Sequence, residues 1–170
     1  MYMPLTEKTK NNLWMASYIV WTLLMITQIV LAFFLKAEYL PAAKNAGWGF
    51  IFLSAIFGML PIFTFRRKGD IEKGKTYMHT TKIVSTGIYS IIRHPQYMAG
   101  MLINIGIILI SQHWLIIIIG VLAIVLNYID ALKADGDLIK KFGNKYLDYM
   151  EKVPRLNFIA GIIRKIWINK

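Results

Sequence analysis

Long apolar stretches without a charged side chain constrain this chain more than any other feature. Residues 13–35 form a run of 23 uncharged residues, and residues 47–65 form a second uncharged run. A helix of about 20 apolar residues crosses the roughly 30 Å hydrocarbon core of a bilayer. Two more apolar runs, 95–110 and 114–129, have 16 residues each and are separated only by Ser111-Gln112-His113. Runs so short and so close together favour a helical hairpin in a locally thinned or protein-lined region.

The sequence therefore predicts one all-α integral-membrane domain over residues 1–170, with four transmembrane helices. The predicted spans are 13–35, 47–65, 95–110 and 114–132, the last two forming the hairpin. The hydrophobic share of 56% exceeds what a soluble globule normally holds, which is about 45–50%. The chain has no cysteine, which excludes disulfides and thiolate metal ligands, and no metal site is predicted.

The distribution of Lys and Arg predicts the orientation of the spans. Of the 20 basic residues, 18 lie before the first span, between residues 66 and 93, or after residue 132, and two lie between residues 36 and 44. Basic residues concentrate on the cytosolic side of membrane proteins. We therefore expect both termini and the central loop to face the cytosol at the cytoplasmic membrane. The net charge of +11 indicates an anionic membrane surface as partner, and no nucleic acid, because the charges flank apolar spans.

Polar and turn-forming residues concentrate in a motif just before the third apolar run. Thr86-Gly87-Ile88-Tyr89 is followed, three residues later, by Arg93-His94-Pro95-Gln96-Tyr97. Proline is favoured as the first residue of a helix, and a helix start offers free backbone N–H groups to an anion. Polar side chains next to membrane spans are energetically expensive and mark functional sites. The motif therefore indicates a binding site at the membrane surface.

A second motif follows the last apolar run and predicts two further helices. Leu138, Phe142, Tyr146, Tyr149 and Val153 recur every three or four residues, which predicts one face of a single cytosolic tail helix. The last residues combine isoleucines, a tryptophan and basic side chains, which predicts an amphipathic helix lying in the membrane interface. That helix is expected from these residues: Ile159, Ile162, Ile163, Arg164, Lys165, Ile166, Trp167 and Lys170.

Together the two motifs resemble the superfamily of isoprenylcysteine carboxyl methyltransferases and phospholipid methyltransferases, over roughly residues 81–154. The resemblance implies a small membrane enzyme that uses S-adenosylmethionine, with cofactor-binding segments near 79–97 and 130–155. By position it implies these cofactor contacts: Thr81, Lys82, Ile83, Val84, Tyr89, His94, Pro95, Gln96 and Tyr97. We add Tyr146 of the second motif as a further candidate contact. We add Arg93 and His94 as the expected catalytic residues, because both supply polar groups beside the cofactor.

The chain departs from the family pattern where an arginine and an acidic pair are common. With Phe142-Gly143 as the anchor, the arginine position holds Asp130 and the acidic pair falls on Ala134 and Asp135. The cofactor's ammonium group needs an anionic partner, and two candidates remain open. Asp130 lies one helical turn before position 134 and can reach the same space, while Asp135 is a direct replacement.

The expected reaction is transfer of a methyl group from S-adenosylmethionine to a lipid-embedded or amphiphilic acceptor. Because the arginine is missing, the acceptor stays open between a prenylcysteine carboxylate, a phospholipid amine and a small thiol. One alternative is a membrane sterol-type reductase that uses NADPH, since those enzymes carry a similar Arg-His-Pro-x-Tyr segment. Another is a non-catalytic membrane scaffold.

Overall fold

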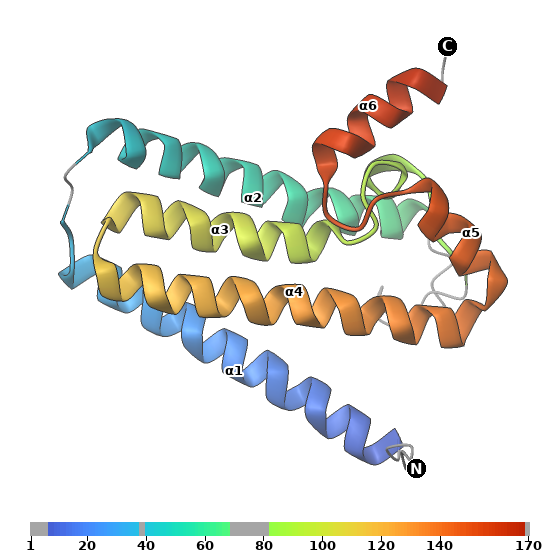
Figure 1. Cartoon of the computed structure of the whole chain (residues 1–170), viewed down its shortest axis with the longest axis horizontal. Helices are drawn as coiled ribbons and strands as arrows, with labels where there is room; N and C mark the ends of the chain where they lie inside the picture. Colours follow the sequence, from blue (N-terminus) through green and yellow to red (C-terminus); the bar gives the residue numbers. More distant parts are fainter. Residues whose placement is uncertain (1–6, 38–39, 69–81, 169–170) are drawn as a thin grey trace.

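The computed structural model describes residues 7–37, 40–68 and 82–168, and these residues form helices and turns without a strand. Thr81 and most of the central loop lie outside the described residues. Figure 1 shows the long helices side by side and the shorter ones at one end. The elements, in chain order, are α1 (Glu7–Phe34), α2 (Pro41–Lys68), η2 (Gly87–Ser90), α3 (Pro95–Ser111), α4 (Trp114–Phe142), α5 (Asn144–Lys152) and α6 (Phe158–Ile168).

The four long helices form an up-and-down bundle in which α3 is central. α2 and α4 pack on α3, and α1 packs mainly on α4 and leaves it toward its own first residues (Figure 1). Three of these helices contain a stretch long and apolar enough to cross a bilayer: Asn12–Phe34, Pro41–Thr64 and Trp114–Phe142. The predicted all-helical membrane protein is therefore confirmed at this level. α3 is apolar but has 17 residues, so the count of four spans stays a prediction.

The helical hairpin predicted around residues 111–113 is present. α3 ends at Ser111 and α4 begins at Trp114, with Gln112 in the left-handed region at φ 53°. The Gln112 side-chain amide bonds both the N–H and the carbonyl of Leu40, just before α2. This contact ties the α1–α2 connection to the α3–α4 turn at one end of the bundle.

Close backbone contact between α2 and α3 depends on two glycines. A Cβ built on Gly106 would lie 2.9 Å from the Gly47 carbonyl oxygen and 2.7 Å from Ile51 Cγ1. A Cβ built on Gly47 would in turn lie 2.8 Å from the Gly106 carbonyl oxygen. Small residues at helix crossings allow the close van der Waals packing that holds membrane helices together. This contact holds the last turns of α3 against the first turns of α2.

We expect Gly106→Ala to lower the stability of the folded protein, because the added methyl group must push α2 and α3 apart. Overpacking of this kind costs about 1–3 kcal/mol. Thermal unfolding of detergent-purified protein measures the effect. Gly49→Ala is the matched control, since a Cβ at Gly49 meets nothing within 4 Å. Equal midpoints for the two variants would contradict the packing argument.

The prediction of a single tail helix through residues 138–153 is wrong. α4 continues as one helix to Phe142, and Gly143 then breaks it with φ 58°. Glycine adopts positive φ without the steric penalty of other residues, so the chain turns there and restarts as α5. Leu138 and Phe142 still pack against Tyr146, Tyr149 and Val153, because the turn folds the two helices onto one another.

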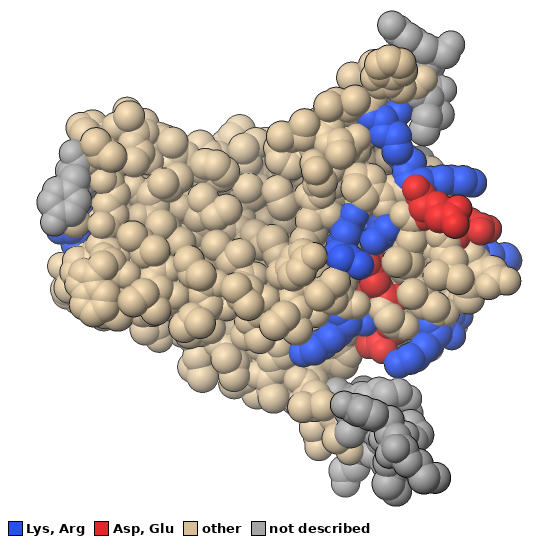
Figure 2. All heavy atoms as spheres, viewed as in Figure 1, with Lys and Arg blue, Asp and Glu red and all other residues tan. Residues whose placement is uncertain are grey.

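Charged side chains gather at one end of the molecule. Figure 2 shows Lys, Arg, Asp and Glu concentrated where α4 ends and α5 lies, while the sides of the long helices on this face are uncharged. α1 begins and α3 begins at this same end (Figure 1). The two polar motifs therefore meet on one side of the bundle, as a joint site requires.

Candidate functional site

The centre of the polar end is the carboxylate of Asp135, a residue of α4 that is 3% exposed. Its Oδ1 accepts from His94 Nε2 at 2.6 Å and from the Tyr146 hydroxyl at 2.7 Å. Its Oδ2 accepts from Arg93 Nη2 at 3.0 Å and from Arg155 Nε at 2.6 Å. A buried carboxylate is tolerated when charged partners and hydrogen bonds replace its water. We call these five residues the Asp135 cluster.

The cluster joins three parts of the chain that are distant in sequence. Arg93 and His94 immediately precede α3, where Pro95 takes the first helical position. The backbone N–H of Arg93 donates to the Pro154 carbonyl at 3.0 Å, and that of His94 donates to the Arg155 carbonyl at 3.2 Å. The segment after α5 is thereby held against the start of α3, which brings Arg155 to Asp135.

Arg93 also holds the end of α5. Its Nη1 donates to the Met150 carbonyl at 2.7 Å and to the Val153 carbonyl at 2.8 Å. The last carbonyls of a helix have no partner within the helix, and the guanidinium supplies one. Because its side chain is only 6% exposed, Arg93 joins α5 to α4 through contacts inside the protein.

The tyrosines of α5 are buried against the first motif. The Tyr149 hydroxyl donates to the Tyr89 carbonyl at 2.6 Å, and the Tyr146 and Tyr149 rings lie 5.7 Å apart. Burial raises the pKa of the Tyr146 phenol, and its bond to the Asp135 carboxylate acts in the same direction. Burial likewise raises the pKa of Tyr149. Both phenols therefore stay protonated and act as hydrogen-bond donors in the site.

Arg155 differs from Arg93 because its side chain is partly exposed. The hydrogen bond to Asp135 raises the pKa of the Arg155 guanidinium above its ordinary value. Two guanidinium groups thus face one carboxylate, which favours its ionised form. Since an ionised carboxylate only accepts hydrogen bonds, His94 must carry a proton on Nε2 to bond it.

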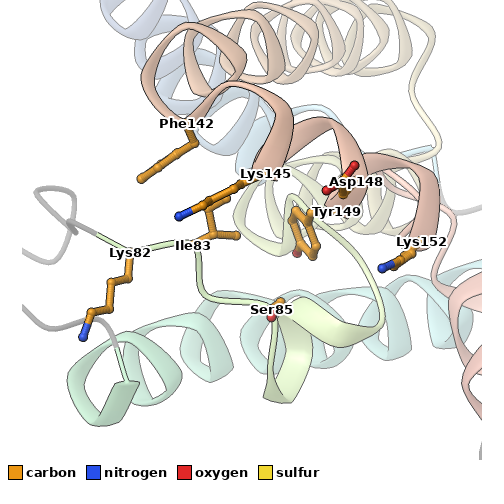
Figure 3. Close-up of a pocket in the computed structure, with 8 residues that line it drawn as sticks. All are labelled: Lys82, Ile83, Ser85, Phe142, Lys145, Asp148, Tyr149 and Lys152. Atoms are coloured by element: carbon orange, nitrogen blue, oxygen red, sulfur yellow. The ribbon is translucent and has the colours of Figure 1, made fainter.

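A cavity of about 530 Å³ lies between α5 and the segment that precedes η2. Figure 3 shows the side chains that surround it, from residues 82–85 on one side and from the end of α4 and α5 on the other. Its volume is within the range of small-molecule sites, about 300–1,000 Å³. Tyr149 lines this cavity, and its ring lies beside that of Tyr146 in the Asp135 cluster. The lining residues are Lys82, Ile83, Ser85, Phe142, Lys145, Asp148, Tyr149 and Lys152.

The lining of the cavity suits a ligand that combines a flat ring with charges of both signs. Phe142 and Tyr149 offer aromatic surface, and Asp148 can pair with a cationic group. Lys82, Lys145 and Lys152 can pair with an anion. Among the residues that the structure describes, no group of three or more metal-ligating side chains lies together.

Asp130 lies apart from the Asp135 cluster. It faces α1, where the Ser17 hydroxyl lies 2.6 and 2.7 Å from its two carboxylate oxygens, and Lys133 Nζ lies 3.1 Å away. Of the two acidic candidates left open by the sequence, the structure brings only Asp135 to His94. Asp130 instead joins α4 to α1.

The other predicted cofactor residues fall into three groups. Lys82 and Ile83 line the cavity, and Val84 and Tyr89 are buried in the core beside it. Pro95 is buried and Gln96 is exposed at the start of α3.

Tyr97 is half-buried on the same turn. Its ring lies 5.6 Å from that of His94, and its carbonyl accepts from Asn127 Nδ2 at 3.1 Å. The placement of Tyr97 therefore links the first motif to the middle of α4.

Sequence reasoning missed Arg155 and most of the cavity lining. Arg155 follows the second motif directly but stands outside its periodic pattern, so no spacing signal marks it. Lys145, Asp148 and Lys152 have the spacing of one helical face, and that recurrence was the available signal for a charged wall on α5.

The fold and the site together define an integral-membrane helical protein with a buried polar site at one end of its bundle. The sequence pattern of the family described as phospholipid methyltransferase matches residues 45–142, more than half of the chain. The chain belongs to the phospholipid methyltransferase family. The resemblance inferred from the two motifs is thereby confirmed.

Curated relatives point in the same direction. The mouse protein-S-isoprenylcysteine O-methyltransferase is 27% identical over 142 residues, covering 76% of this chain and 49% of the relative. The rat protein of the same name is 28% identical with the same coverage. The Xenopus laevis protein is 32% identical over 94 residues, which cover 54% of this chain and 32% of the relative. The chain spans about half the length of the mouse and rat proteins.

Proposed function

We propose that this protein transfers a methyl group from S-adenosylmethionine to a lipid-embedded or amphiphilic acceptor. The observation that carries this proposal is the cavity between residues 82–85 and α5, because its lining residue Tyr149 packs beside Tyr146 of the Asp135 cluster. Membership of the phospholipid methyltransferase family supports the reaction class. Nothing particular to the site favours the sterol-type reductase.

In this proposal the cavity holds the cofactor. S-adenosylmethionine, when bound, supplies a methyl group on a positively charged sulfur. Lys82 and Ile83 form one wall, as the family resemblance implies for these positions, and Phe142 and Tyr149 pack on the ring system. Asp148 pairs with the ammonium group, and the lysines of α5 pair with the carboxylate.

The Asp135 cluster has a positioning role in the proposal. Asp135 orients His94 through Nε2, and Tyr146 fixes the other side of the same carboxylate oxygen. A rigid arrangement of this kind is what holds reacting groups in line for displacement at a methyl carbon. Arg93 acts by holding the end of α5, which carries one wall of the cavity.

The role of His94 depends on the acceptor. A prenylcysteine carboxylate or a thiolate attacks without a base, because charge is neutralised as the methyl group moves, and a poorly solvated site favours that change. A phospholipid amine must lose a proton, and His94 Nδ1 is then the proposed proton acceptor. The acceptor's apolar tail stays in the bilayer beside the bundle.

Calorimetry on detergent-purified protein tests the cofactor assignment. S-adenosylhomocysteine, the demethylated form of the cofactor, should bind, and NADPH should not. Binding of NADPH alone would support the reductase, and binding of neither would support the scaffold. Methylation assays with a prenylcysteine, phosphatidylethanolamine and a small thiol then identify the acceptor class.

We expect Asp148→Asn to weaken binding of S-adenosylhomocysteine, because the variant loses a charge-assisted contact to the ligand's ammonium group. The loss of about 1.5–3 kcal/mol corresponds to roughly tenfold or more in dissociation constant. Glu151→Gln is the matched control on α5, since Glu151 is exposed and does not line the cavity. Equal affinities in the two variants would place the ligand elsewhere.

A further inference from the structure

The two sides of α6 have the opposite polarity to that of a helix on a water-soluble protein. Its outward side carries five large apolar residues that are between 42% and 76% exposed: Ile159, Ile162, Ile163, Ile166 and Trp167. Its inward side carries the two basic residues Arg164 and Lys165, both turned to the body of the protein. Exposed apolar patches of this kind mark an interaction surface.

The inward side of α6 is fastened to the turn η2 and to α2. Arg164 Nη2 donates to the Ser90 carbonyl at 3.2 Å, and Lys165 Nζ donates to the Ser90 hydroxyl at 2.8 Å. Gly161 is buried directly against the Ile91 carbonyl oxygen, where a Cβ would overlap that atom. Phe158 makes an edge contact with Phe57 of α2, with ring centroids 5.5 Å apart.

The surroundings of α6 identify a bilayer as the partner of its apolar side. The contact with Phe57 makes α6 continuous with α2, a helix long and apolar enough to face lipid. Figure 1 shows α6 leaving the bundle at an angle to α2, near the end where charges gather in Figure 2. Tryptophan is enriched at the interface between membrane and water, and Trp167 is the most exposed of the five apolar residues of α6. An apolar hollow of about 240 Å³, lined by Ile91, Ile162, Lys165 and Ile166, can take part of an acyl chain.

The turn that α6 holds also shapes the wall of the cavity. The Ser90 hydroxyl donates to the Gly87 carbonyl at 2.7 Å, which closes η2. The neighbouring Tyr89 carbonyl accepts from Tyr149, a residue that lines the cavity. A displacement of α6 would therefore move Ser90, and the neighbouring Tyr89 connects Ser90 to Tyr149 in the cavity wall.

We propose that α6 is a helix embedded in lipid that supports the turn η2. Its apolar side lies in the boundary between headgroups and acyl chains, and its inward side keeps η2 in the position that bonds Tyr149, a residue of the cavity wall. The membrane thus contributes to the order of the site, whichever reaction the site performs.

Fluorescence quenching in phosphatidylcholine nanodiscs tests the lipid contact. The emission of Trp167 is isolated as the difference between the full chain and its Trp167→Phe variant. Lipids brominated close to the headgroup should quench this emission more than lipids brominated at the chain end, and aqueous iodide should quench it little. Quenching by iodide alone would place α6 in water. Shielding from both quenchers with a doubled particle mass would place a second copy there, and either result would overturn the proposal.

Hydrogen exchange tests the connection to the turn. In the double variant Ile163→Glu, Ile166→Glu we expect lipids brominated near the headgroup to quench Trp167 no longer. The backbone amides of residues 87–92 should then exchange hydrogen about tenfold faster, because local opening becomes easier. Leu147→Glu is the matched control, an exposed apolar position on the charged helix α5, and should leave both measurements unchanged. Lost quenching with unchanged exchange would refute the coupling. Neither measurement uses the cofactor, so failure of the proposed methyl transfer would be seen separately.

Discussion

Asp135→Asn should destabilise the protein more than any other single polar substitution described here. The carboxylate is 4% exposed and accepts bonds from two guanidinium groups, an imidazole and a phenol. An asparagine at this position would leave the buried Arg93 charge without an anionic partner. Removing one partner of a buried ion pair costs about 3–5 kcal/mol. Thermal unfolding of detergent-purified protein measures the loss, and calorimetry should find no binding of S-adenosylhomocysteine.

Asp130→Asn is the control that shows whether the loss in Asp135→Asn comes from the charged partners of Asp135. Asp130 is equally buried, but its partners are the Ser17 hydroxyl and the partly exposed Lys133. A neutral asparagine can still bond the hydroxyl, so the expected loss is about 1 kcal/mol, with cofactor affinity retained. Asp135→Glu should recover part of the stability because it keeps the charge. Equal effects of Asp130→Asn and Asp135→Asn would contradict the assignment of Asp135 as the centre of the site.

Arg93→Lys should show whether Arg93 acts through α5 or by touching a substrate. Lysine keeps the charge but lacks the planar fork that reaches the Asp135 carboxylate and the Met150 and Val153 carbonyls at once. We expect a loss of about 2–3 kcal/mol, since hydrogen bonds to charged groups contribute roughly 1.5–3 kcal/mol. Both the unfolding midpoint and the affinity for S-adenosylhomocysteine should fall.

Arg155→Lys supplies the matched control for this variant. Arg155 bonds the Asp135 carboxylate through Nε and its side chain is 29% exposed, so lysine and water can replace much of its interaction. Its effect should be clearly smaller. If Arg93→Lys instead lowered methyl transfer at an unchanged unfolding midpoint, Arg93 would act on the reacting groups directly, as expected of a catalytic residue.

The apolar spans and the hairpin could be predicted because they depend on local properties. A run of uncharged residues such as 13–35 must leave water wherever it lies in the fold, and three residues between two apolar runs leave room only for a tight turn. The observed helices are longer than the predicted spans, because α2 and α4 extend past the apolar runs into charged sequence. Periodicity alone joined residues 138–153 into one helix. Periodicity does not show that Gly143 adopts a positive φ and ends α4.

The membership of the Asp135 cluster could be predicted only in part. His94 and Arg93 were found because proline and the turn residues around them form a recognisable local motif. The choice between Asp130 and Asp135 stayed open, since the two lie five residues apart on one helix and the sequence does not say which neighbour each side faces. Arg155 has no local signal at all, because its contact depends on the path of the chain after α5.

The sequence by itself determined that the chain is helical, that it is a membrane protein, and that its two polar motifs belong to one family of methyltransferases. Each of these follows from the transfer energy of apolar side chains or from residues close together in the chain. Only the tertiary structure decided that Asp135 gathers four donors, that Asp130 turns to α1, and that α6 presents its apolar side outward. Those properties depend on which helix faces lie against one another, and the packing of helix on helix sets them through contacts between residues tens of positions apart.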